Sequence, residues 1–418
     1  MIELINKKQC LFLSFITGFI VAIFFPPAIY PDSQGYIEYD SLRSFGYPLL
    51  IFILGKNLKL VIFSQAFLTI FSSVYFSNQL KKLFEFQKLT NIIFLFLISL
   101  IGIKISINIL PGSFCFSIYL LSLTYAIKSY QNNKIKDYLI AGLLIFITTL
   151  IRPQLIFAIS HLIIVGLYLW HENKKNLILI ISIIIIILIA PNKLNKLANL
   201  KFNNLDVSIS DTWNQLLIFP LFVSDTSLLN HIKNEKSKDL FLLSLKCAEQ
   251  KNLTKSKSNE LQQNWIYVLE SNSFPVKNCT NIAVSKKFPN YTSQMKEDIS
   301  KQFYFDLVKA HINNNALIFF MDFIKKYSFA FINIYYFAIF IIFSLILIVL
   351  QIYKRNKKLF IFNLFLLNHL SNVFIIGLGA PLLLRYRFYT ETVLIILILS
   401  ILFEFFLSQN VKKSNKSE

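Results

Sequence analysis

Long apolar runs recur along the whole of this 418-residue chain, and each has about the length that a helix needs to cross a membrane. The hydrocarbon core of a bilayer is about 30 Å thick, so about 20 apolar residues in a helix make one span. Each run ends at a cluster of Lys or Asn, which marks the return to water. We predict spans at residues 10–28, 60–80, 91–110, 113–128, 138–151, 154–170, 177–190, 330–350, 359–379 and 388–408. The sequence therefore predicts an all-α polytopic membrane protein with about ten transmembrane helices.

Basic residues orient these spans. Lys and Arg cluster in alternate short loops, at residues 7–8, 81–88, 128–136, 174–175, 354–358 and 412–416. Because positively charged short loops stay in the cytoplasm, both termini of this multi-pass protein are predicted to be cytoplasmic. The predicted location is a bacterial inner membrane. The first span ends without a small-residue cleavage site and is read as an uncleaved anchor. The net charge of +20 is then explained by topology, and no nucleic-acid partner is expected.

The predicted spans divide the chain into four parts. Residues 1–190 form an N-terminal transmembrane module, whose first outer loop covers residues 29–58. Residues 191–328 form one large, mostly helical, extracytoplasmic loop domain. Residues 329–410 carry the C-terminal transmembrane helices, and residues 411–418 form a cytoplasmic tail.

Two smaller features accompany this topology. The apolar stretch Tyr47 to Leu54 is too short to span a bilayer, so we expect it to lie at the interface or to enter the membrane only partway. Cys247 and Cys279 both lie in the large outer loop, where an oxidising compartment would permit a disulfide. Two cysteines alone leave the pairing open.

Acidic residues are concentrated in the first outer loop. Asp32, Glu38 and Asp40 fall within nine consecutive positions just after the first span. A carboxylate that is partly desolvated at a membrane boundary is a candidate general base. The alternative is a solvated loop whose acids only keep it outside the membrane.

Arginine is rare in this chain, and its placement is informative. The chain has 37 Lys and only five Arg. Four of the five lie on the predicted outer side, namely Arg43, Arg152, Arg385 and Arg387. A guanidinium binds phosphate or carboxylate with two parallel hydrogen bonds, so these residues are candidate phosphate ligands. The alternative is that Arg152 and Arg385 reach lipid headgroups or pair with an acid, namely Asp32, Glu38, Asp40 or Glu391.

Other familiar site motifs do not occur. The five His show no metal-ligand spacing, and we predict no metal site from them. The sequence has no Walker A motif, no GxGxxG and no GxSxG elbow. Nucleotide binding of those types is therefore not expected.

Several short motifs resemble those of one enzyme superfamily. The first outer loop reads D32-S-Q-G-Y36 and then R43-S-F-G-Y-P48. The third predicted outer turn lies in L150-I-R-P-Q154, and L384-R-Y-R387 precedes the last span. In type, order and sidedness these are similar to features of the GT-C glycosyltransferases, which include dolichyl-phosphate-mannose-protein mannosyltransferases and aminoarabinose transferases. The resemblance covers about residues 5–170 and, more loosely, 300–405.

The resemblance implies an activity and roles for particular residues. Such enzymes transfer a sugar from a polyprenyl-phosphate carrier to a glycan, lipid or protein acceptor on the outer face. Asp32 would then be the base that deprotonates the acceptor hydroxyl, the outer arginines would bind the donor phosphate, and Tyr36 and Tyr47 would line the substrate site. Unlike many relatives, the chain has no acid beside Asp32 or in the second outer loop, so Glu38 or Asp40 would supply any second carboxylate. No cofactor is firmly implied, and a divalent cation stays open.

Two other classes compete with this interpretation. A polymerase or ligase of lipid-linked oligosaccharides also combines many spans with a large outer loop, but its phosphate-binding arginines usually lie in that loop, and here the loop has none. A non-enzymatic transporter would be expected to show internal repeats and charges within its spans. Charges within the predicted spans are few here, and no repeat is evident.

Overall fold

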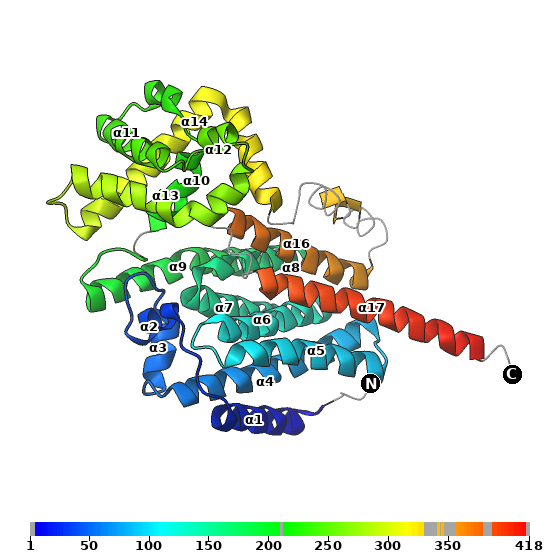
Figure 1. The fold of residues 1–418 in the computed structure, drawn as a ribbon. Helices are drawn as coiled ribbons and strands as arrows, with labels where there is room; N and C mark the ends of the chain where they lie inside the picture. The colour runs from blue at the N-terminus through cyan, green and yellow to red at the C-terminus, as the bar shows by residue number, and fades with distance from the viewer. Residues whose placement is uncertain are drawn as a thin grey trace. The chain divides into compact units, whose positions relative to one another are not determined.

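The computed structural model describes residues 5–209, 212–329, 341–342, 344–346, 356–378 and 387–414. These residues form helices and connecting turns, and no strand is present among them beyond one isolated bridge between Ala28 and Asn108. Seven of the helical segments are long and apolar enough to cross a membrane. This is the pattern of an all-α, multi-pass membrane protein (Figure 1).

The chain forms two compact units, which are described separately. Unit 1 comprises Met1–Ala198, Ser344–Asn372 and Arg387–Glu418. Unit 2 comprises Asn199–Phe343 and Val373–Tyr386. The predicted start of the outer domain, residue 191, lies inside a helix that continues to Asn203.

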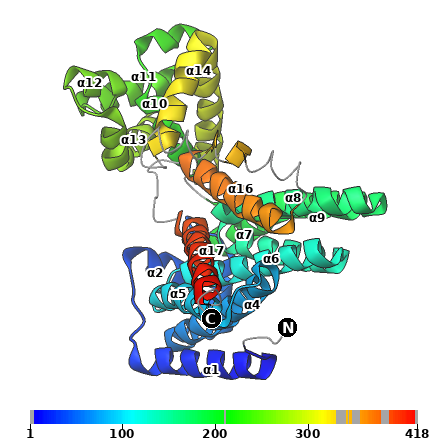
Figure 2. The same cartoon turned by 90° about the vertical axis from the view of Figure 1, so that its right-hand side faces the viewer.

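Unit 1 is a bundle of long helices. Its elements are α1 (Lys7–Phe24), α2 (Pro31–Ile37), α3 (Gly46–Ile53), α4 (Leu58–Phe84), α5 (Lys88–Ser106), α6 (Gly112–Asn132), α7 (Ile135–Ile151), η1 (Pro153–Ala158), α8 (Ile159–Glu172), η2 (Lys174–Asn176), most of α9 (Leu177–Asn203), most of α16 (Lys357–Leu378) and α17 (Phe388–Ser414). The last residues of α9 and α16 belong to unit 2. Helix α4 packs against α1, α5 and α6, while α6 also packs against α7 and α8. Both views show α4 to α7 lying side by side (Figures 1 and 2).

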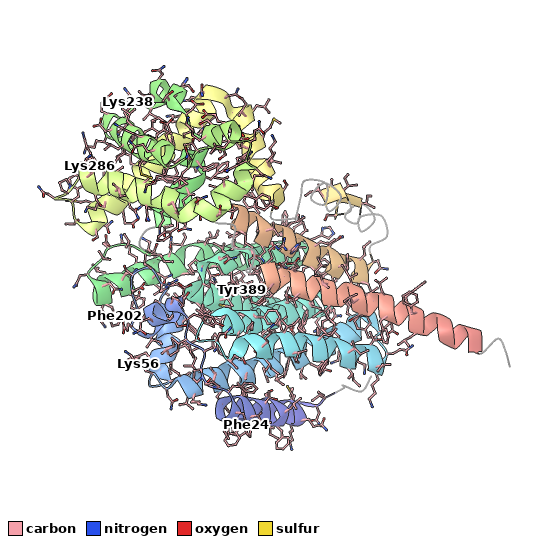
Figure 3. All side chains as sticks on the ribbon, viewed as in Figure 1. Phe24, Lys56, Phe202, Lys238, Lys286 and Tyr389 are labelled. Carbon is pink, nitrogen blue, oxygen red and sulfur yellow. A yellow bond between two sulfur atoms is a disulfide. The ribbon has the colours of Figure 1, made fainter. Side chains whose placement is uncertain are left out.

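The outer faces of this bundle are apolar. On α1, Phe12 is 67% exposed and Phe24 is 73% exposed, and Figure 3 shows Phe24 on the rim of the unit. Helix α9 likewise exposes Ile178, Ile185 and other large aliphatic residues. A soluble protein rarely exposes contiguous apolar surface of this extent, so the helices are suited to lipid.

Helices occupy nine of the ten predicted spans. The remaining one, 330–350, falls outside the described residues except for 341–342 and 344–346. Helices α6 and α7 are not among the seven segments that meet the length and hydropathy requirement. Helix α7 has only 17 residues, and α6 carries many hydroxyl side chains, including Ser113, Ser117 and Thr124, which are buried against neighbouring helices.

The stretch expected at the interface forms the short helix α3. Its eight residues are too few to cross a bilayer. Phe52 and Ile53, at its end, are 70% and 69% exposed. A helix that lies at the membrane surface can bury such exposed apolar side chains among the lipids.

Unit 2 is a separate helical domain with its own core. Its elements are α10 (Thr212–Phe222), η3 (Thr226–His231), α11 (Glu235–Gln250), α12 (Lys255–Glu260), α13 (Trp265–Lys287) and α14 (Ser293–Phe329). Fully buried side chains such as Phe222, Phe241, Leu269 and Phe303 form that core. Figure 3 shows Lys238 and Lys286 projecting from its surface, as expected for a domain in water.

A disulfide joins Cys247 on α11 to Cys279 on α13. The sequence left this pairing open, because spacing does not determine whether two cysteines meet. Helices α11 and α13 pack against each other in one core, and this packing brings the two sulfur atoms together. A disulfide persists in an oxidising compartment, which agrees with the predicted outer location of this part of the chain.

Replacing both Cys247 and Cys279 with Ser should lower the free energy of unfolding of unit 2 by about 3 to 4 kcal/mol, because the cross-link closes a loop of 32 residues. Hydrogen exchange of α11 and α13 in the full chain measures the change. Dithiothreitol should accelerate exchange in the unsubstituted protein and leave the double variant unaffected. Equal exchange in the two proteins without reductant would show that the bond contributes nothing.

Candidate functional site

The first outer loop begins with the short helix α2, which carries Asp32 in its first turn. Pro31 occupies the first helical position, where its missing N–H has no partner to lose and its fixed φ suits the helix. The backbone N–H of Tyr30 donates to the Ser33 hydroxyl at 2.9 Å, and Ser33 is fully buried. These contacts fix the first turn of α2 and so the backbone position of Asp32.

Helix α2 ends in a tight turn that reverses the chain. Tyr39 has a φ of 59°, a left-handed conformation that costs a non-glycine residue roughly 1 to 2 kcal/mol. The N–H of Asp40 donates to the carbonyl of Gly35 at 2.9 Å, the pattern of a Schellman cap. The Asp40 carboxylate in turn accepts the N–H of Leu42 at 2.7 Å. The turn therefore directs Arg43 back across α2.

This reversal joins Asp32 and Arg43 in an ion pair. Nη2 of Arg43 donates to Oδ1 of Asp32 at 2.8 Å. Burial lowers the pKa of Arg43, but the neighbouring Tyr36 and Asp32 outweigh this effect and raise the pKa above its ordinary value. The Asp32 side chain is 45% exposed. It is therefore an accessible carboxylate that is paired with a guanidinium.

Two tyrosines support the guanidinium of Arg43. Its Cζ lies 5.1 Å from the centre of the Tyr36 ring, within the range of a cation–π contact. The Tyr36 ring meets the Tyr47 ring edge to face at 5.4 Å. Tyr47 is completely buried, and its hydroxyl donates to Oε1 of Gln65 at 3.5 Å. Tyr36 and Tyr47 thus connect the Arg43 side chain to the interior of the bundle.

Gln65 connects this loop to the turn between α5 and α6. Its Nε2 donates to the carbonyls of Ser106 and Asn108, each at 3.0 Å. Asn108 also forms the isolated bridge with Ala28, at the start of the first outer loop. The first and second predicted outer connections of unit 1 are therefore fixed to each other by backbone and amide hydrogen bonds.

A second attachment joins the first outer loop to the end of α7. The hydroxyl of Ser44 donates to the carbonyl of Ile151. A Cβ added to Gly46 would lie 2.8 Å from the backbone nitrogen of Ile151, so only glycine permits this approach. Ser44 directly follows Arg43 in the chain, and Ile151 directly precedes Arg152. The contact therefore brings the two arginine-bearing turns together.

Arg152 is oriented by a tyrosine from the last helix. Its Nη1 donates to the hydroxyl of Tyr389 at 3.3 Å, and Tyr389 is fully buried (Figure 3). A Cβ added to Gly112, at the start of α6, would lie 3.9 Å from the same hydroxyl. Arg152 also interacts electrostatically with Cys115. The second, third and last predicted outer turns of unit 1 therefore meet around Tyr389.

Arg387 lies at the start of the same last helix. Its Nε is 3.2 Å from Oε2 of Glu391, one turn further along. The Thr390 hydroxyl is within 3.0 Å of Nδ1 of His369 and accepts from Nδ2 of Asn372 at 2.9 Å. These buried polar contacts attach the beginning of α17 to α16. These contacts therefore fix the backbone position of Arg387.

The structure brings some of the predicted site residues together. Asp32, Arg43, Tyr36 and Tyr47 form one contacting cluster, and the Ser44 contact attaches it to the turn of Arg152. We call this the Asp32 cluster, defined by these first four residues.

Other predicted residues lie apart from the Asp32 cluster or pair elsewhere. Glu38 is exposed and accepts from Nε2 of Gln34, whereas Asp40 stabilises the turn and interacts electrostatically with Arg43. Arg43 pairs with Asp32 and Arg387 with Glu391, whereas Arg152 donates to the hydroxyl of Tyr389. Arg385 lies outside the described residues.

Three residues that build the site were not predicted from the sequence. Gly35 is one of only ten glycines in the chain, and Gln65 is a polar residue within an apolar run, so both carried a readable signal. Tyr389 carried none, because aromatic residues make up 16% of the chain. Its role follows only from the fold, which brings α17 beside Arg152.

The described residues include no group of three or more His, Cys, Asp or Glu side chains arranged to hold a metal ion. Asp32 contacts the guanidinium of Arg43, and Asp40 accepts a hydrogen bond from the backbone of the turn. The geometry of the described site is thus that of a carboxylate and guanidinium pair.

Comparison of the chain with family models, with curated proteins and with solved structures gave no match in any of the three.

Proposed function

We propose that this protein is a membrane glycosyltransferase that moves a sugar from a polyprenyl-phosphate carrier to an acceptor hydroxyl on the outer face of the membrane. The observation that carries the proposal is the accessible Asp32 carboxylate, held 2.8 Å from Arg43 on a loop that is attached beside Arg152. Such a reaction needs a base for the acceptor hydroxyl and cationic donors for the leaving phosphate, and this small region contains both.

In the proposed reaction, Asp32 accepts the proton of the acceptor hydroxyl as that oxygen attacks the anomeric carbon of the sugar. The bond between the anomeric carbon and the phosphate oxygen breaks, and its electron pair leaves with the polyprenyl phosphate. Since 45% of the Asp32 side chain is exposed, an acceptor can approach the carboxylate without the loop unfolding. The transferred proton stays on Asp32 until water removes it.

The leaving phosphate needs positive charge that is already oriented. A guanidinium has five N–H donors, so Arg43 can donate to Asp32 through Nη2 and still bind a second anion. Arg152 is oriented by Tyr389, and Arg387 is carried by the same helix as Tyr389. We propose that these arginines, with Arg385, bind the donor phosphate, since preformed donors stabilise developing charge without reorganising.

The outer location has two independent supports. Lys and Arg gather in the loops at the other end of the spans, which is the bias of cytoplasmic loops. The disulfide between Cys247 and Cys279 suits an oxidising compartment. The exposed apolar faces of unit 1 would let a lipid-linked donor approach from within the bilayer.

The proposal is tested by incubating the purified protein with a panel of polyprenyl-phosphate sugars and a crude acceptor fraction. Release of polyprenyl phosphate together with a labelled acceptor is expected for at least one donor. If the labelled sugar instead crosses a vesicle membrane with its carrier bond intact, the protein is a transporter. If no donor in the panel is consumed, the proposed activity is refuted.

Replacing Gly35 with Ala should lower the transfer rate roughly tenfold to a hundredfold. A Cβ at this position would overlap Oδ2 of Asp40 and lie 3.1 Å from Nε of Arg43, so both charged groups must move. Alanine favours a helix over glycine by about 1 kcal/mol, so α2 itself should persist. Steady-state rates measure the effect, and Gln34→Ala, at an exposed position of the same helix, serves as the control. Wild-type rates in Gly35→Ala would show that the position of Arg43 is unimportant.

A further inference from the structure

The second half of α14, residues 316–329, starts as a new helix within unit 2. Asn315 has a φ of −157° and a ψ of 88°, so the helix is interrupted there. The Oδ1 of Asn315 accepts the backbone N–H of Ile318 at 3.1 Å, which is the hydrogen bond of an N-cap. Asn315 thus sets a new direction for the residues that follow it, and this half of α14 lies at an edge of unit 2 (Figure 1).

One face of this helix packs into the core of unit 2. The Phe219 ring on α10 lies 5.6 Å from the ring of Phe319 and 6.0 Å from that of Phe323. Asp322 is the only acid between residues 316 and 328, and it is buried and paired with Lys255. This face therefore attaches the helix to the domain, and it also carries the single carboxylate of the segment.

The opposite face is apolar and exposed. Five large apolar side chains on it are between 44% and 70% exposed, namely Leu317, Ile318, Phe320, Met321 and Ile324. At about 100° per residue they cover an arc of about 160° around the helix axis, centred opposite Phe319. Lys325, near one edge of this arc, is the only exposed charged residue between residues 316 and 328. A contiguous apolar face of this kind marks a contact with a membrane or with another protein.

The end of this helix contacts the end of a helix that can span the membrane. Helix α16 is long and apolar enough to cross a bilayer, and its residue Phe374 belongs to unit 2. The Phe374 ring lies 6.5 Å from the ring of Phe323 and 5.9 Å from that of Tyr327. Lys357 and Lys358 lie at the other end of α16, so Phe374 is near the predicted outer end of this span. The exposed face of α14 therefore adjoins the predicted outer boundary of the membrane.

The sequence also returns to the membrane directly after this helix. The predicted span 330–350 begins at the residue that follows Phe329. An extended chain covers at most about 3.6 Å per residue, so Ile324 lies within about 22 Å of the start of that span whatever path the chain takes. The apolar face is thus close to one span through a packing contact and to another through the chain.

We propose that this face of α14 docks onto the outer leaflet of the lipid bilayer and buries its five apolar side chains among the lipids. A helix with a wide apolar arc and few charges lies in the membrane interface. Lys325, at the edge of the arc, can extend its ammonium toward anionic headgroups. Unit 2 is then held at the membrane by this face as well as by its covalent connections. The proposal rests on the predicted topology and does not depend on the activity proposed above.

The test uses the full-length protein in nanodiscs of phosphatidylcholine and phosphatidylglycerol. In a Cys10→Ala/Cys115→Ala background, which leaves the disulfide intact, a nitroxide is attached at Leu317→Cys or at Met321→Cys. The matched control is Leu242→Cys, on α11, where the apolar side chain is 45% exposed. Electron paramagnetic resonance measures collisions of the nitroxide with oxygen, which concentrates in lipid, and with a water-soluble nickel chelate.

The ratio of oxygen to nickel accessibility should be severalfold higher at Leu317 and Met321 than at Leu242. A phosphatidylcholine with a diazirine in its acyl chain provides a second measurement on the unsubstituted protein, and on irradiation it should label residues 317–324 but not residues 235–250. Equal ratios at the three positions, or no label in residues 317–324, would overturn the proposal. Exclusion of both collision reagents at Leu317 and Met321 would also overturn it, because protein would then cover the face.

Discussion

Replacing Asp32 with Asn is expected to slow sugar transfer by roughly 10²- to 10⁴-fold, the usual contribution of a general base. Asparagine keeps the size of the side chain and can still accept a hydrogen bond from Nη2 of Arg43, but it cannot take the proton of the acceptor. The rate of carrier release with a saturating donor measures the loss.

Folding should survive this substitution. The ion pair between Asp32 and Arg43 is partly exposed, and pairs of that kind contribute about 1 kcal/mol or less. Thermal unfolding of the purified variant should therefore match the unsubstituted protein within a few degrees. A variant that unfolds would not report on catalysis, so this measurement accompanies the rate.

The neighbouring acids provide matched controls for Asp32. Glu38→Gln removes an exposed carboxylate whose recorded partner is Gln34, and it should leave the rate nearly unchanged. Asp40→Asn keeps an acceptor for the N–H of Leu42 and should have a small effect through Arg43. If Glu38→Gln abolished transfer and Asp32→Asn did not, the base would be assigned to the wrong carboxylate.

The second large effect is expected at Arg152. Arg152→Gln should reduce transfer by roughly 10²- to 10³-fold, the usual loss on removing one preformed donor to developing charge. Arg152→Lys should recover only part of the rate, because an ammonium is a point charge and lacks the planar fork that binds two phosphate oxygens. The dependence of the rate on donor concentration separates binding of the phosphate from stabilisation of the leaving group.

Tyr389→Phe tests how Arg152 is positioned. It removes the hydroxyl that accepts from Nη1 at 3.3 Å while keeping the buried ring. We expect a loss smaller than that of Arg152→Gln, because the charge remains and only its orientation relaxes. An unchanged rate in Arg152→Gln would exclude this arginine from phosphate binding and favour the structural role considered from the sequence.

The spans could be predicted from the sequence because a run of about 20 apolar residues between polar clusters is typical of a transmembrane helix. Details inside the spans were less readable. The hydroxyls of α6 lower its hydropathy, yet Ser117 and Thr124 are buried and bond to their own or a neighbouring helix. Helix α9 continues through Pro191 to Asn203, beyond the predicted end at residue 190, because the local polar composition does not by itself stop a helix.

The candidate site was only partly readable for a different reason. Residue type and density pointed to Asp32 and to the outer arginines. The ion pair between Asp32 and Arg43 depends on the turn at Tyr39, and no sequence motif predicts the left-handed backbone of that residue. From the sequence, Asp32 was expected to be a partly desolvated carboxylate and Arg43 a phosphate ligand. The reversed chain instead places Arg43 against Asp32 and leaves the carboxylate accessible.

The most direct test of the account is the release of polyprenyl phosphate from a labelled donor, compared among the unsubstituted protein, Asp32→Asn and Glu38→Gln in one detergent. The account predicts release and acceptor labelling in equal amounts for the unsubstituted protein and Glu38→Gln, and release at least a hundredfold slower for Asp32→Asn. Equal rates in all three proteins, or no release from any donor of the panel, would contradict it.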